Sequence, residues 1–125
     1  MIDKKIVLTN EKMFIKAVEL QKKGNTLESL KIYQYLIKSG FNNPYLYFNY
    51  GLILFNKGNL VEAKSFFLKT IKIKTNFLNA YFYIINIFLN IQQFSEAEKF
   101  ARKTIELNPN LYESHANLGG ILKEL

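Results

Sequence analysis

Apolar residues recur along most of the chain with the period of an α-helix. In the first such stretch, residues 10–23, the apolar side chains of Met13, Ala17 and Leu20 stand at spacings of four and three. This spacing places them on one face of a helix. Residues 24–26, Gly-Asn-Thr, interrupt the pattern as expected for a helix stop followed by a cap. Alternation with period two never persists over a strand's length, so the pattern predicts an all-α fold.

The same arrangement of two helices separated by a short turn recurs along the chain. It predicts helices over residues 10–23, 26–39, 44–57, 60–73, 78–91, 94–107 and 112–125. Pro44 suits the first turn of a helix, and Pro109 suits the break after one. We therefore expect seven helices.

Windows of 34 residues that begin at positions 10, 44, 78 and 112 hold the same residue classes at the same places. The eleventh place holds Leu20, Leu54, Phe88 and Leu122, and the twentieth holds the small residues Ser29, Ala63 and Ala97. Small residues let neighbouring helices approach closely. The period divides the chain into a lead-in over 1–9, units over 10–43, 44–77 and 78–111, and the first helix of an incomplete fourth unit over 112–125.

The residue classes at these places resemble the pattern of the tetratricopeptide repeat, which is a helix-turn-helix of 34 residues. The residues that carry the resemblance are Tyr47, Tyr50, Gly51, Leu54, Ala63, Phe67 and Ile71 in the second unit, Tyr81, Ile84, Phe88, Ala97, Ile105 and Pro109 in the third, and His115, Leu118, Gly119 and Leu122 in the last. The segment 114–122 is also similar to arrays of O-GlcNAc-transferase-like glycosyltransferases and of bacterial multi-repeat proteins.

The resemblance implies a right-handed α-solenoid of about 3.5 repeats, in which the first helices of the units line a concave groove. The family geometry points the following residues into that groove: Phe14, Val18, Phe48, Asn49, Leu52, Phe55, Phe82, Tyr83, Asn86, Leu89 and Asn117. Aromatic surface with interspersed amides suits a peptide or a partner protein. For Phe48 and Phe82, contact with a ligand and packing between helices remain equal alternatives.

A specialised version of this fold clamps the terminal carboxylate of heat-shock chaperones with lysines, asparagines and an arginine in the groove. Asn49 stands at a matching place. The other clamp places hold Phe14, Val18, Asn79 and Tyr83. The resemblance therefore disfavours binding of chaperone tails.

The composition offers little catalytic chemistry. The chain has 125 residues, enough for one domain, and no cysteine. Its one histidine, His115, stands where the repeat calls for a large packing residue. We expect no catalytic residues, no metal, no cofactor and no enzymatic activity.

Charge and hydropathy bear on partners and location. Seventeen basic residues stand against ten acidic ones, for a net charge of +7. Lys64, Lys69, Lys72 and Lys74 fall on the back of the predicted array, where we expect a solvated face. Weak nucleic-acid binding by this face is a less favoured alternative. The sequence indicates neither a secretory leader nor a membrane span, so we expect a cytoplasmic location and no membrane partner.

The last predicted helix carries Leu118, Ile121, Leu122 and Leu125 without the second helix that the pattern calls for. We predict either that the chain is the amino-terminal piece of a longer repeat protein or that two copies associate through this helix. The favoured function is a non-enzymatic scaffold that binds a peptide or protein in its groove. The alternative is an accessory amino-terminal segment of a larger transferase of the glycosyltransferase type.

Overall fold

The computed structural model describes residues 3–125, which form seven α-helices and no strand. The helices are α1 (Lys4–Lys22), α2 (Thr26–Lys38), α3 (Pro44–Asn56), α4 (Leu60–Ile73), α5 (Leu78–Asn90), α6 (Phe94–Leu107) and α7 (Tyr112–Glu124). The predicted all-α fold is confirmed. From α2 onward, every helix begins and ends within one residue of its prediction.

The first helix differs from its prediction. It begins at Lys4 rather than Asn10, so residues 4–9 are helical and not a separate lead-in. Residues 1 and 2 of that lead-in lie outside the described residues. The Asp3 carboxylate caps this earlier start by accepting a hydrogen bond from the Lys5 backbone N–H at 2.9 Å. No proline or glycine stands between Asp3 and Gly24 to interrupt the helix.

The turn inside each unit follows one design. A residue in the left-handed region ends the first helix, with φ of +86° at Gly24, +84° at Gly58 and +59° at Gln92. The next backbone N–H then donates to a carbonyl five residues earlier, at the repeat place held by Leu20, Leu54 and Phe88, over 2.8 to 2.9 Å. This bond is the Schellman closure of a helix C-terminus.

Small residues bring the two helices of each hairpin together. Ser29, Ala63 and Ala97 are fully buried. The Ser29 hydroxyl donates to the Ala17 carbonyl across the first hairpin at 2.8 Å. In the second hairpin, a Cβ atom added to Gly51 would lie only 2.8 Å from the Phe67 ring.

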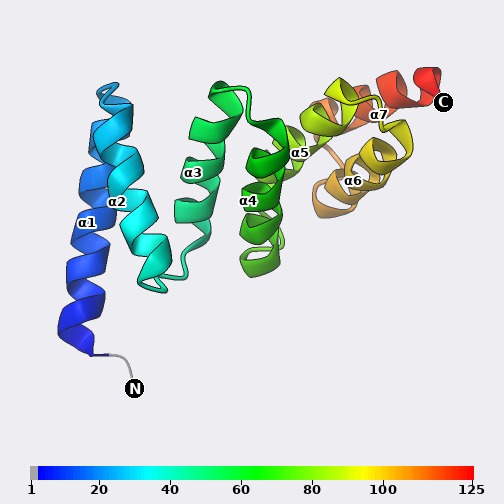
Figure 1. Cartoon of the computed structure of the whole chain (residues 1–125). Coiled ribbons are helices and arrows are strands. Elements are labelled where there is room, and N and C mark those ends of the chain that lie inside the picture. The colour runs from blue at the N-terminus through cyan, green and yellow to red at the C-terminus, as the bar shows by residue number, and fades with distance from the viewer. Residues whose placement is uncertain (1–2) are drawn as a thin grey trace.

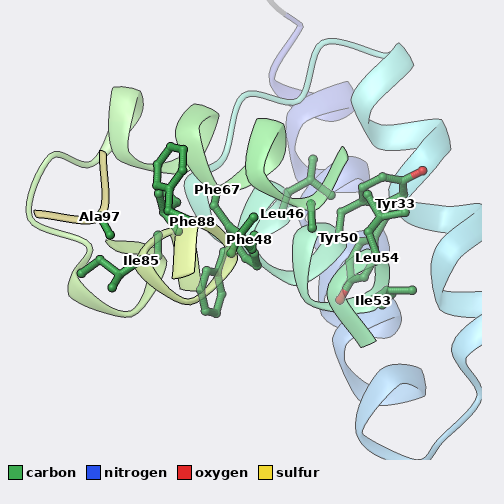
Figure 2. Packing of buried hydrophobic residues seen from close by; sticks show 14 of the residues in the cluster. Tyr33, Leu46, Phe48, Tyr50, Ile53, Leu54, Phe67, Ile85, Phe88 and Ala97 are labelled. Atoms are coloured by element: carbon green, nitrogen blue, oxygen red, sulfur yellow. The ribbon is translucent and has the colours of Figure 1, made fainter. Parts of the chain in front are cut away.

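The hairpins follow one another in an elongated array, with the two termini at opposite ends (Figure 1). The junction of α2 with α3 is packed less closely than those of α4 with α5 and of α6 with α7. One apolar core nevertheless runs from Ala17 to Ile121 through all the units. Figure 2 shows its middle part, where Phe48, Phe67 and Phe88 lie among the helices.

Candidate functional site

Phe48 belongs to the core. Its side chain comes from α3 and is only 9% exposed. Its ring lies 4.7 Å from the ring of Phe77, 5.6 Å from Phe67 and 5.9 Å from Tyr83, measured between centroids. The structure thus shows Phe48 packed between helices.

The Tyr83 side chain of α5 packs against aromatic side chains of α3 and α4. Its ring lies 5.0 Å from that of Phe55 and stacks on Phe67 at 5.2 Å with an interplanar angle of 20°. Leu52 and Phe55 are partly buried against the same core. The protein's own aromatic side chains therefore occupy this part of the predicted groove.

The surface between α5 and α7 is hollowed. Two adjoining cavities of about 320 and 470 Å³ lie there and share Leu89, Ala116 and Asn117 as lining residues. We call this depression the α5–α7 hollow. Its lining includes Phe82, Asn86 and Leu89 from α5, and Glu113, Ala116, Asn117, Gly120 and Glu124 from α7.

Small side chains on α7 explain why the hollow is open. Ala116 occupies the repeat place that holds Phe82 in the third unit. Gly120 occupies the place of Asn86, and Asn117 that of Tyr83. A Cβ atom added to Gly120 would meet nothing within 4 Å.

Four of the predicted groove residues, Phe82, Asn86, Leu89 and Asn117, line this hollow. Ala116, Gly120 and the two glutamates stand at places that the repeat geometry points inward, but they are not among the predicted site residues. The signal in the sequence that could have predicted an open surface is the replacement of larger residues by Ala116 and Gly120 at these repeat places of the last helix.

The predicted groove residues at the amino-terminal end are engaged in packing or are half-buried. Phe14 is partly buried, with its ring 6.1 Å from that of Tyr33 and 6.0 Å from that of Phe41. Val18 and Asn49 are half-buried.

The Tyr33 hydroxyl donates to the Gln21 side-chain oxygen at 2.6 Å. Burial raises the pKa of Tyr33 above its ordinary value of 10.0, and hydrogen bonds with Ser29 and Asn49 partly offset this rise. The Tyr33–Gln21 hydrogen bond thus joins α2 to α1 at this end of the array.

The lysines of the middle unit, for which the sequence predicts a solvated face, include Lys69 and Lys72, which are exposed, and three of the four also contact aromatic side chains. The Lys64 ammonium lies 4.8 Å from the centre of the Phe88 ring, and that of Lys69 lies 4.7 Å from the centre of Phe66. Lys74 donates to the Tyr45 hydroxyl at 2.8 Å. These three cations therefore contact the protein's own aromatic side chains.

His115 is exposed, which corrects its predicted place as a packing residue. Its Nε2 atom lies 2.7 Å from the Pro109 carbonyl oxygen. Within residues 3–125 there is no group of three or more His, Cys, Asp or Glu side chains suited to a metal ion. None of the seven described helices combines the length and apolar character needed to cross a bilayer.

The apolar side chains of α7 do not all face solvent. Ile121 is buried and Leu118 is packed against the core. Leu122 and Leu125 are 46% and 57% exposed. Of the four residues predicted to mediate self-association, two remain open to a second copy.

Residues 44–77, which cover α3 and α4, match the family model of the tetratricopeptide repeat. No curated protein sequence matches the chain. Several solved structures share its fold. The first tetratricopeptide-repeat domain of Spaghetti (RPAP3), bound to the HSP90 peptide SRMEEVD, superposes with a TM-score of 0.77 at 22% identity and covers 98% of this chain and 94% of its own.

Two further structures extend the comparison. The tetratricopeptide-repeat domain of Arabidopsis OM64 has a TM-score of 0.80 at 18% identity, over 95% of this chain and 98% of its own. The third structure is the Yersinia enterocolitica type III secretion chaperone SycD in complex with a peptide of the translocator YopD. It has a TM-score of 0.79 at 18% identity, and the match covers 94% of this chain and 95% of the SycD chain. The predicted solenoid of helix hairpins is thus confirmed as the fold.

Proposed function

We propose that this chain, which has the fold of tetratricopeptide-repeat domains and carries one such repeat at residues 44–77, is a non-enzymatic scaffold that binds a peptide segment of a partner protein. The single observation that carries the proposal is the α5–α7 hollow. It is concave, it presents the apolar surface of Phe82 and Leu89, and it offers the amides of Asn86 and Asn117. Such a surface can hold apolar side chains while the amides bond a peptide backbone.

Two of the similar structures support this use of the fold, because one contains an HSP90 peptide and the other a YopD peptide. We place the main contacts of this chain at Phe82, Asn86, Leu89 and Asn117. The packed residues between α3 and α5 position α5 for this contact.

A display selection tests the proposal. A library of random twelve-residue peptides is panned against the immobilised protein, and the affinity of enriched peptides is measured by fluorescence anisotropy. Ala116→Phe is the matched variant, because it restores the residue type that α5 carries at the same repeat place and fills the hollow without removing a contact. Circular dichroism checks that the variant stays folded.

We expect peptides that bind the wild type and lose at least about tenfold in affinity for Ala116→Phe, which corresponds to about 1.4 kcal/mol of binding free energy. Enrichment no greater than on a surface without protein would refute the scaffold function. Equal binding by the variant would refute the assignment of the site.

A further inference from the structure

The charge of the α5–α7 hollow is opposite in sign to that of the whole chain. The chain carries a net charge of +7. Within the described residues, however, no lysine, arginine or histidine lines the hollow, whereas Glu113 and Glu124 do. The hollow therefore carries acidic groups and no cation in its lining, although the chain as a whole is basic.

The two carboxylates stand at opposite ends of the hollow. Both residues belong to α7 and are separated by eleven positions. Eleven residues at 100° each turn about 20° beyond three full turns, so both lie on one face of the helix, about 16 Å apart along its axis. Ala116, Asn117 and Gly120 lie between them on that face and leave the space open.

Neither carboxylate is neutralised by the protein. The ion pairs found in residues 3–125 all lie within α6, where Glu96, Glu98 and Glu106 pair with neighbouring cations at 2.8 to 3.2 Å. Glu113 and Glu124 take no part in them. Both side chains are exposed, so they are free to pair with charges that a ligand brings.

From this geometry we infer that the α5–α7 hollow binds a basic peptide segment. Apolar side chains of the segment pack on Phe82 and Leu89, and a lysine or arginine near each end pairs with Glu113 or Glu124. The two basic residues are about 16 Å apart, which about five extended residues or about eleven helical ones span. This inference rests on the proposed scaffold function and adds the chemistry of its ligand.

The same charges disfavour an acidic ligand. An acidic segment in the hollow would place its carboxylates near Glu113 and Glu124 with no cation in the lining to compensate. The HSP90 peptide SRMEEVD, held by the similar Spaghetti domain, is rich in acidic residues. We therefore expect this chain to prefer a different class of peptide.

The first test is the charge of the peptides enriched from the random twelve-residue library. We expect them to carry a net positive charge around an apolar centre, and to bind more weakly as salt is raised because exposed ion pairs are screened. Enriched peptides that are acidic or uncharged would overturn this inference alone. The absence of any enrichment would overturn the scaffold function as well.

Two pairs of variants complete the test on an enriched basic peptide. The double variant Glu113→Gln, Glu124→Gln should weaken binding of the peptide about three- to tenfold. Its control is the double variant Glu28→Gln, Glu62→Gln, which removes the same charge from α2 and α4 and should leave binding unchanged. Gly120→Leu, which narrows the hollow, should weaken binding at least about tenfold.

Gly119→Leu is the control for this last variant, because Gly119 is a neighbouring exposed glycine of α7 that does not line the hollow. Its affinity should stay within about twofold of the wild type. Unchanged binding by either hollow variant, with the fold intact by circular dichroism, would contradict the inference.

Discussion

Replacement of Gly51 by alanine tests how closely the two helices of the second hairpin approach. The added Cβ atom would lie 2.8 Å from Cε1 of Phe67, whereas ordinary van der Waals contact begins at 3.4 Å. The ring would have to retreat by about 0.6 Å. It has little room to do so, because Phe67 is fully buried between Phe48 and the stacked ring of Tyr83.

Two opposing effects set the size of the change in the free energy of unfolding. Overpacking a filled core costs about 1–3 kcal/mol. Alanine in place of glycine inside a helix returns about 0.5–1 kcal/mol. We therefore expect Gly51→Ala to lower the free energy of unfolding by about 1–2 kcal/mol. For a chain of this length, this change lowers the melting temperature by about 4–8 °C.

The assay is thermal and urea unfolding followed by circular dichroism. Gly119→Ala serves as the control, because a Cβ atom there meets nothing within 4 Å, and it should stabilise the protein by about 0.5–1 kcal/mol. In a Phe67→Leu background, where the ring is absent, Gly51→Ala should become stabilising. A Gly51→Ala protein that melts at or above the wild-type temperature would refute the close packing of Gly51 against Phe67.

Three further predictions concern the turns, the tyrosines and the last helix. Gln92→Gly should raise the free energy of unfolding by about 0.5–1 kcal/mol in urea titrations, because Gln92 adopts a φ of +59° that strains a side chain. The free energy of unfolding should fall as pH rises above about 10. Burial raises the pKa of Tyr33 in the folded chain, so the unfolded chain loses this proton at a lower pH than the folded chain does. Tyr33→Phe should make this fall smaller when unfolding at about pH 8 and pH 11 is compared. If two copies associate through Leu122 and Leu125, light scattering should show a mass that rises with concentration and becomes monomeric in a variant with serine at both positions.

The sequence predicted the helices well because their boundaries are set by local chemistry. Gly24, Gly58 and Pro44 act on the backbone within one or two residues, and a 34-residue period makes each unit a check on the next. The start of α1 differs from the prediction because the Asp3 cap lies outside the repeated units, so the repeat register carries no information about it.

The candidate site could be predicted only in part. The repeat register identifies which side chains point inward, but not whether a neighbouring side chain already fills the space they face. Tyr83 lies against Phe48 and Phe55, whereas the partly buried Phe82 has the small Ala116 beside it and lines the hollow. This difference depends on distances between side chains from separate units, which a single sequence does not provide.

The most direct measurement is a map of backbone amide chemical shifts in the isotope-labelled protein, with and without an enriched peptide. A ligand in the α5–α7 hollow should shift the amides of α5 and α7 most, above all those near Asn86, Leu89, Ala116 and Asn117. Shifts concentrated on α2 and α4, which contribute no residue to the lining of the hollow, would contradict binding there.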